Sequence, residues 1–338
     1  MRAFFSPRQL AHAPAVELHN GGFAPYAEVP ARAEAILAAI GAAELPADEG
    51  LAPIRAVHDA FYLDFLQAAP AMWRAAGRPG EAIPYAFPVV RRRPLTLERI
   101  DALLGAHAID ATTPLTDATW NAAYWSSQTA LAATRAVLAG DRAAFALCRP
   151  PGHHAGRDYC GGYCHLNHAA VAAQAARDGV FGAGVERVAI LDIDYHHGNG
   201  TQDIFWARGD VLYASLHADP AGDFPFFWGH ADERGEDAGE GTTLNLPLPR
   251  GTALDAFRRA QGQALDAIAR FGPGLLVVSF GADTWEGDPI SAFRLATPDY
   301  ALLARDIAAA GWPTAIVMEG GYAVEAIGRN VASFLAGF

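Results

Sequence analysis

The chain has 338 residues, of which 51% are hydrophobic and 18% charged, and its 37 acidic and 25 basic side chains give a formal net charge of −12. This composition excludes an intrinsically disordered chain, and the acidic balance excludes the broad basic surface that nucleic acids and anionic membranes attract. All 25 basic residues are arginine, so a Schiff-base lysine and the lysine of a phosphate-binding P-loop are excluded too.

The N-terminus and the cysteines indicate where the protein works. Two prolines and an arginine among the first 14 residues interrupt any apolar leader sequence, and no run of about 18 apolar residues could span a bilayer. The three cysteines, Cys148, Cys160 and Cys164, favour buried reduced thiols over a disulfide framework. We therefore expect a cytoplasmic protein with no membrane partner and no nucleic-acid partner.

Short apolar segments alternate with helix-like segments along most of the chain, which predicts an α/β fold with a parallel sheet. The expected strands show little alternation, as strands buried on both faces do. In chain order they are Ala144–Cys148, Val188–Ile193, Val211–His217, Leu275–Phe280 and Ala315–Met318. The helices expected between them are Asn167–Asp178, Leu254–Phe271 and Pro298–Ala310.

The chain shows no internal repeat and no low-complexity linker, so we expect a single domain over residues 1–338. Its first 140 residues carry weaker patterns and are expected to pack outside the sheet and to shape a site. The proline-rich stretch Gly77–Pro94 and the acidic, glycine-rich stretch His230–Gly241 are predicted to be loops.

Two adjacent histidines follow the first of the expected internal strands. The loop that carries them, residues 149–154, reads R-P-P-G-H-H, and its prolines and glycine fix a turn at the end of the strand. His153 and His154 are therefore candidate acid–base groups, although such a pair taken alone is more often incidental.

A second polar segment, residues 192–200, reads D-I-D-Y-H-H-G-N-G and follows the apolar strand that begins at Val188. Alternate residues of a strand share a face, so Asp192, Asp194 and His196 should point the same way at its C-terminal end. Adjacent carboxylates repel each other unless they share a proton or bind a cation. An exposed acidic turn is the alternative, and the apolar segment before it argues against that alternative.

Two further polar groups follow the expected strands Leu275–Phe280 and Ala315–Met318. Asp283 would complete a set of two carboxylates and one histidine that suits a divalent metal with an open position for water, although alone it is also a candidate helix N-cap. Tyr322 follows two glycines and could donate its hydroxyl to a developing oxyanion, which is a weak signal by itself.

Taken in order, four motifs resemble those of the histone deacetylase superfamily and most closely those of the bacterial acetylpolyamine amidohydrolases. They are R-P-P-G-H-H at 149–154, D-x-D-x-H-H-G-N-G-T at 192–201, G-x-D-T at 281–284 and E-G-G-Y at 319–322. The resemblance covers essentially the whole chain, from a strand at Arg2–Phe5 onward. It implies an arginase-like, three-layer α/β/α fold with an eight-stranded parallel sheet.

The same resemblance implies two cations. A catalytic zinc ion would be held by Asp194, His196 and Asp283. A structural potassium ion would be held at Asp192, Ser215 and Leu216.

Catalytic roles are implied in the same way. His154 corresponds to the general base, His153 to the second histidine and Tyr322 to the group that polarises the scissile carbonyl. Asp192 would pair with His153, and Asn199 would orient the other histidine. A histidine beside an anionic carboxylate has a stabilised cation, whereas one beside a neutral amide stays closer to its base form at neutral pH.

The resemblance also places residues around the substrate. Gly162, Tyr163 and Phe224 would line a narrow channel to the zinc. An insert loop, Pro84–Thr119, would form the channel mouth and the interface of a homodimer. At positions where relatives carry mouth residues, this chain has Asp101, which keeps an acidic group, and the departures Thr112 and His19.

The expected function is zinc-dependent hydrolysis of N-acetylated small amines, such as short acetyl-diamines, to acetate and a free amine. The first alternative is a deacetylase for acetyl-lysine or other acylated amines. A second is binuclear, arginase-like hydrolysis, which needs further metal-bridging ligands. A third is an inactive binding protein, which would be expected to have lost Tyr322 or one of the paired histidines.

Overall fold

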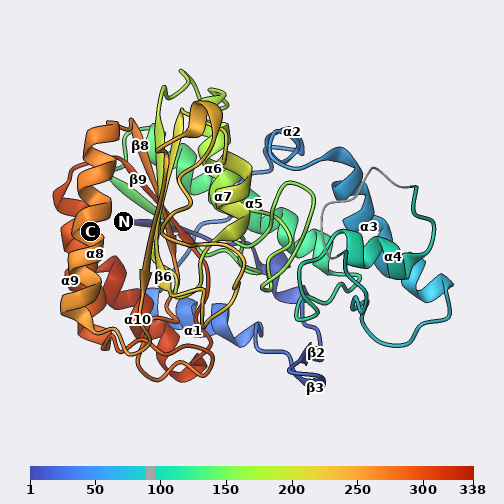
Figure 1. Cartoon of the computed structure of the whole chain (residues 1–338). Helices are drawn as coiled ribbons and strands as arrows, with labels where there is room; N and C mark the ends of the chain where they lie inside the picture. Colours follow the sequence, from blue (N-terminus) through green and yellow to red (C-terminus); the bar gives the residue numbers. More distant parts are fainter. Residues whose placement is uncertain (89–95) are drawn as a thin grey trace.

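A parallel sheet of seven strands runs through the centre of the molecule in the computed structural model, which describes residues 1–88 and 96–338 (Figure 1). Every neighbouring pair of strands in it is parallel. The predicted strands are confirmed, with small shifts at their ends. In sheet order the strands are β1 (Arg2–Phe4), β4 (Ala143–Ala146), β9 (Thr314–Met318), β8 (Leu275–Phe280), β5 (Val188–Asp192), β6 (Val211–Ala218) and β7 (Thr243–Leu248).

This sheet has one strand fewer, among the described residues, than the eight that the resemblance implied. Beside β1, the place of a further strand is taken by the single residue Glu44, which donates to Ala3 O at 2.8 Å and accepts from Phe5 N at 2.9 Å. Helix α1 (Ala31–Ile40) ends shortly before it, and Pro46 follows it without an amide hydrogen. The pairing therefore stops after one bridge.

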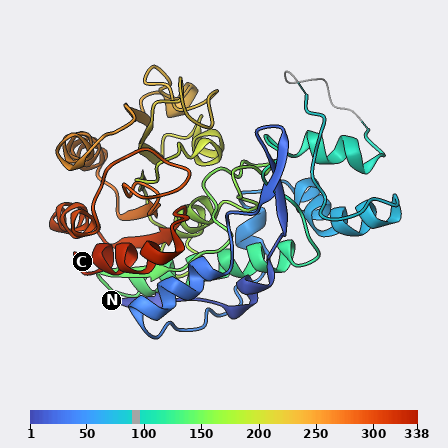
Figure 2. The same ribbon diagram turned by 90° about the horizontal axis from the view of Figure 1, so that it is seen from below.

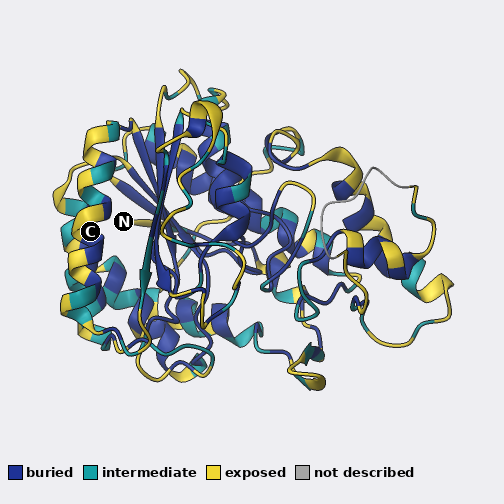
Figure 3. Cartoon of the chain, in the orientation of Figure 1, coloured by how far each residue is buried: buried dark blue, intermediate teal, exposed yellow. Residues whose placement is uncertain are grey.

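Helices cover both faces of the sheet, and those on one face are far more exposed on their outer sides than those on the other (Figures 1 and 3). One face packs against α5 (Thr119–Leu138) and α6 (His168–Arg177). The other packs against α1, α8 (Leu254–Phe271), α9 (Thr297–Ala309) and α10 (Val324–Leu335). The three predicted helices are confirmed, and Asn167 caps α6 by accepting from Ala170 N at 2.9 Å.

Strand β5 shows why the strands are apolar along their whole length. Val188 and Ile190 belong to the core beneath α5 and α6, whereas Ala189 and Leu191 belong to the core beneath α8, α9 and α10. Because both faces are buried, the usual alternation of polar and apolar residues is absent.

Most of the N-terminal third lies outside the sheet, as predicted, and extends to one side of the body (Figure 2). It contains one short 3-10 helix (Pro7–Ala11), the hairpin of β2 (Val16–His19) and β3 (Gly22–Pro25), and helices α2 (Ala52–Arg55), α3 (Ala60–Ala75) and α4 (Ile100–Ala106). Helix α4 belongs to the predicted insert Pro84–Thr119, of which residues 89–95 lie outside the described residues.

Two further elements complete the description. Helix α7 (Asn199–Phe205) begins inside the second polar motif, and the predicted loop His230–Gly241 carries one short 3-10 helix at Asp237–Gly239. All three cysteines are buried free thiols. Within residues 1–88 and 96–338, no helix combines the length and the apolar character needed to cross a membrane.

Candidate active site

The four motifs meet at one edge of the sheet because each follows the C-terminal end of a strand. The strands concerned, β4, β9, β8 and β5, are consecutive neighbours in the sheet. Parallel α/β sheets bind their ligands at this edge. The side chains brought together are His153, His154, Asp192, Asp194, His196, Asp283 and Tyr322.

Asp194, His196 and Asp283 form a compact group of potential metal ligands. One donor atom from each lies within 4.8 Å of the others, and His196 Nδ1 is 3.2 Å from Asp283 Oδ2 and 3.4 Å from Asp194 Oδ1. Both carboxylates are fully buried. Burial raises the pKa of Asp283 to about 7, and the negative charge of Asp194 adds to this rise. A bound cation would remove this repulsion.

Glycines allow the main chain to approach these carboxylates. A Cβ atom on Gly320 would lie 2.4 Å from Asp283 Oδ2 and 2.6 Å from Asp194 Oδ2, and one on Gly281 would lie 2.0 Å from Asp194 Oδ2. Because Gly320 has no side chain, its amide can approach Asp194 and donates to Oδ2 at 2.8 Å. The glycines of the G-A-D-T and E-G-G-Y motifs thus leave room for the ligand group.

The two adjacent histidines have different partners. His153 Nδ1 lies 3.0 Å from Asp192 Oδ2, and His154 Nδ1 lies 2.7 Å from Asn199 Oδ1. Burial lowers the pKa of both imidazoles, but the charges of Asp194 and Asp192 outweigh it for His153 and raise its pKa to about 10. For His154, burial dominates and the positive charge of His153 adds to it, so the pKa lies well below its ordinary value.

This difference assigns a proton to each ring. The amide oxygen of Asn199 can only accept, so His154 Nδ1 must carry the hydrogen and Nε2 is left with a lone pair. The Asn199 amide in turn donates to His154 O at 3.3 Å, which fixes the direction of the amide. His154 thus presents an unprotonated Nε2 next to His153, whose pKa is raised.

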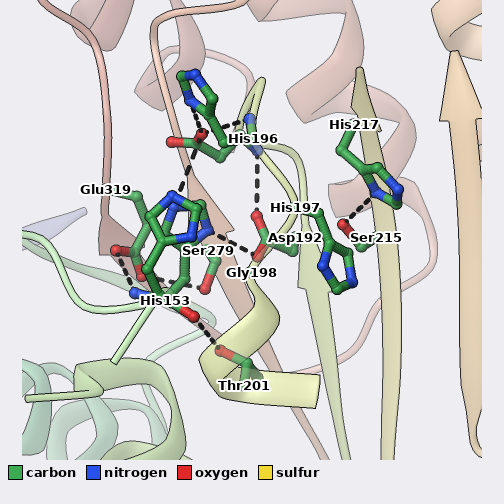
Figure 4. A network of polar contacts seen from close by, with 12 residues as sticks. His153, Asp192, His196, His197, Gly198, Thr201, Ser215, His217, Ser279 and Glu319 are labelled. Carbon is green, nitrogen blue, oxygen red and sulfur yellow. Dashed lines mark hydrogen bonds and ion pairs between the residues drawn. The ribbon is translucent and has the colours of Figure 1, made fainter. Parts of the chain in front are cut away.

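Glu319 is a buried residue of the site that the sequence analysis did not single out (Figure 4). Its Oε2 accepts from Gly152 N at 2.7 Å and from His153 N at 3.1 Å, and its Oε1 accepts from Ser279 Oγ at 3.2 Å. Burial raises its pKa to about 7. Glu319 thus ties the histidine loop to the end of β9, and its sequence signals are its position at the end of an apolar strand and its place as the first residue of the E-G-G-Y motif.

The three residues that the resemblance places in the channel lie beside the candidate catalytic side chains. The Phe224 ring is centred 5.0 Å from that of His154, and the Tyr163 ring is centred 5.4 Å from that of Tyr322. A Cβ atom on Gly162 would lie 2.1 Å from His154 Cδ2, so only glycine allows this loop to pack against the imidazole.

Two of the predicted mouth residues are linked to this channel through one carboxylate each. Thr112 Oγ1 donates to Asp110 Oδ1 at 3.1 Å, and Asp110 Oδ2 accepts from the Gly162 amide at 2.6 Å. His19 Nδ1 lies 3.7 Å from Glu17 Oε1, which accepts from the Tyr163 hydroxyl at 3.1 Å. Glu17 and Asp110 were not singled out from the sequence.

Asp101, the third mouth residue, is arranged differently. Its Oδ2 forms ion pairs of 2.7 Å with both Arg78 and Arg99. The hydrogen bond from Arg99 lowers the pKa of this carboxyl, and Arg78 contributes to the same effect. Two arginines therefore compensate the charge, and the structure does not bring Asp101 into contact with the catalytic group.

The residues predicted for potassium lie on two paired strands. Asp192 of β5 is in register with Ser215 of β6, and Leu216 is the next residue of β6. The Ser215 hydroxyl lies 2.8 Å from His217 Nδ1 (Figure 4).

A second group of potential ligands, His153, Cys164 and Glu319, lies nearby within the described part of the chain. It shares no residue with the first group, so it supplies no carboxylate that bridges two ions. Both oxygens of Glu319 already accept hydrogen bonds from the protein. This arrangement does not favour binuclear hydrolysis.

Comparisons with known proteins find relatives of this chain. A family model described as "Histone deacetylase domain" matches residues 26–338. The chain is 49% identical to an acetylpolyamine amidohydrolase of Mycoplana ramosa, with 100% of this chain and 99% of the relative covered. It is 42% identical to a histone deacetylase-like amidohydrolase of Pseudomonas aeruginosa, over 67% of this chain and 60% of the relative.

Solved structures give the same result. The crystal structure of an acetylpolyamine aminohydrolase from Burkholderia pseudomallei matches with a TM-score of 0.95 and 43% identity, covering 100% of this chain and 98% of that one. The HD domain of HDA15 matches with a TM-score of 0.81 and 26% identity, covering 99% and 90% of the two chains.

Proposed function

The chain belongs to the histone deacetylase family, and from this premise we propose that it hydrolyses N-acetylated small amines, acetylpolyamines and short acetyl-diamines among them, to acetate and the free amine. The observation that carries the proposal is that three potential metal ligands, two histidines with different partners and a tyrosine meet at one edge of the sheet. The substrate class is supported by the names of relatives that match over their full length.

We infer that the catalytic metal is zinc, held by Asp194, His196 and Asp283. Two buried carboxylates and one imidazole within 4.8 Å of one another fit a divalent ion of this kind. A zinc ion bound there would lower the pKa of a nearby water molecule and would polarise the amide oxygen of the substrate.

In this proposal, residues of the chain transfer the protons and stabilise the negative charge that develops. His154 Nε2 accepts a proton as water adds to the amide carbonyl, and the Tyr322 hydroxyl donates a hydrogen bond to the oxygen that becomes negative. The cationic His153 stabilises this negative charge. When the carbon–nitrogen bond breaks, a protonated histidine of the pair delivers its proton to the departing amine, so the products are acetate and the free amine.

Replacing Tyr322 with phenylalanine should lower kcat by about 10²- to 10³-fold, the cost of one oxyanion donor. Burial raises the pKa of Tyr322, so its hydroxyl is protonated and able to donate at neutral pH. Metal content and melting temperature should match those of the wild type, since the ring remains. Steady-state kinetics test this prediction, and an unchanged kcat with a raised KM would show a binding role instead.

We propose a structural potassium ion at Asp192, Ser215 and Leu216, on the strength of the family resemblance and the pairing of the two strands. We also propose a homodimer that uses the insert, whose Tyr85 and Phe87 expose 66% and 41% of their surface. Buried free thiols support a cytoplasmic location.

The substrate preference follows from the mouth residues. Asp101 is compensated by two arginines and Thr112 is neutral, so neither residue offers a distal ammonium group an uncompensated negative charge. Specificity constants for acetylputrescine, acetylcadaverine and acetylspermine should therefore agree within about fivefold. An acetyl-lysine peptide should be the poorest substrate if a dimer narrows the mouth.

A substrate panel on the zinc-loaded protein tests this preference. Thr112→Glu should shift selectivity toward acetylspermine, and Thr112→Gln, similar in size but neutral, should not. A clear preference of the wild type for the acetyl-lysine peptide would contradict the small-amine proposal and would support the lysine deacetylase alternative.

A further inference from the structure

A carboxylate outside the proposed catalytic set holds the main chain of the catalytic tyrosine. Asp288 Oδ2 accepts from Tyr322 N at 2.7 Å and from Ala323 N at 3.3 Å, and Asp288 Oδ1 accepts from Ile290 N at 3.1 Å. Asp288 is 7% exposed. None of its hydrogen bonds in the described residues is with another side chain, so both oxygens serve to fix backbone.

These amides need an acceptor from outside their own segment. Tyr322 and Ala323 immediately precede α10. The first amides of a helix have no hydrogen-bond partner within the helix. Ala323, at the cap position, has no side-chain oxygen. Asp288 supplies the missing acceptor from the loop after β8, and a buried amide left without one would be costly.

The opposite side of the same turn is held by a cation. The Arg32 guanidinium donates to Glu319 O at 2.7 Å and also to Gly321 O, and its Cζ lies 4.8 Å from the centre of the Tyr322 ring. The turn is therefore fixed by an anion on its amides and by a cation on its carbonyls.

The Tyr322 hydroxyl itself has no hydrogen-bond partner within residues 1–88 and 96–338. Its position depends on the backbone of the turn and on ring contacts such as that with Tyr163. The loop that carries Asp288 also carries Asp283, five residues earlier, so one short segment joins a metal ligand to the support of the hydroxyl donor.

We infer that Asp288 is a positioning residue for catalysis, which holds the main chain of Tyr322 so that its hydroxyl meets the oxyanion beside the metal ligands. The inference rests on the proposed amide hydrolysis. It assigns Asp288 a role that acts through Tyr322 and makes no contact with substrate.

A double-mutant cycle distinguishes this role from a structural one. Asp288→Ala should lower kcat by about 10²-fold, the cost of displacing a catalytic group by about 1 Å, while KM and metal content stay near wild type. In a Tyr322→Phe background the same change should cost less than about twofold, since no hydroxyl remains to be positioned. Asp288→Asn, which keeps one acceptor oxygen, should lie between wild type and Asp288→Ala. Equal losses in both backgrounds would overturn the inference.

A matched control separates positioning from general stability. Asp299 Oδ2 accepts from Ala296 N at 2.8 Å at the start of α9, so Asp299→Ala also removes a carboxylate from a helix N-terminus. It should lower the melting temperature comparably and leave kcat unchanged. A loss of kcat in Asp299→Ala as large as in Asp288→Ala would count against a specific role for Asp288.

A readout without turnover tests the contact itself. Hydrogen exchange on the metal-free protein should accelerate in the segment 319–324 of Asp288→Ala and stay unchanged there in Asp299→Ala. Unchanged exchange in Asp288→Ala would overturn the inference. If instead the wild type hydrolysed no acetylated amine, the proposed function would fail while the exchange result still reported on the contact.

Discussion

Replacing His196 with alanine should abolish metal binding and turnover together in a protein that remains folded. His196 supplies the only nitrogen donor of the ligand group, and its removal leaves two buried carboxylates facing each other. We expect metal affinity to fall by more than about 10²-fold, because even the loss of an outer hydrogen-bond partner costs 10- to 100-fold. Metal analysis, chelator competition and kcat should therefore change in parallel.

A buried histidine away from the ligand group provides the control. His107 is 8% exposed and its Nδ1 lies 2.7 Å from Asp158 O, so His107→Ala removes a comparable imidazole without touching a ligand. It should retain metal and most of the activity. Full activity in a metal-free His196→Ala protein would refute the proposed zinc-dependent hydrolysis.

The central strands and their helices were predictable because their signals are local. The predicted ranges Leu275–Phe280 and Leu254–Phe271 coincide with β8 and α8, since one is uniformly apolar and the other follows a period near 3.6. Strand β7 was missed because it is an edge strand with alternating burial and contains Pro247. Helix α5 was missed because its small residues are buried on nearly every side, which removes the amphipathic pattern.

The candidate site, like the fold, could be predicted from the sequence only in part. The proposed ligands were found because each polar residue directly follows an apolar strand, which places it at the edge of the sheet without knowledge of the fold. Arg32 and Asp288 were not found, and Glu319 was noted only as part of the E-G-G-Y motif, because the roles of all three consist of contacts between distant segments. Arg32, for example, bonds a carbonyl 289 positions away, and no local pattern marks such a pair.

Replacing His154 with alanine should lower kcat by more than about 10²-fold, because general bases contribute about 10²- to 10⁴-fold and the neighbouring imidazole cannot substitute. Asp192 Oδ2, 3.0 Å from His153 Nδ1, favours the protonated form of that ring, so His153 is poorly placed to accept the proton instead. The metal content should not change, since His154 is not one of the three ligands. A loss of less than about tenfold would show that another group accepts the proton.

The proposed role of His154 as the base can also be tested through its hydrogen-bond partner, Asn199, by measuring how activity depends on pH. Asn199→Asp would place an anion at Nδ1, and an anionic partner favours the imidazolium and raises its pKa. Because the base must be unprotonated to act, the acidic limb of the kcat/KM profile should move to higher pH, and activity should be lost below that limb. Asn199→Ala removes the hydrogen bond without adding charge, so it should lower kcat through poorer orientation but should not move the limb upward. An unmoved limb in Asn199→Asp would mean that His154 is not the base, because its protonation would then not govern the rate.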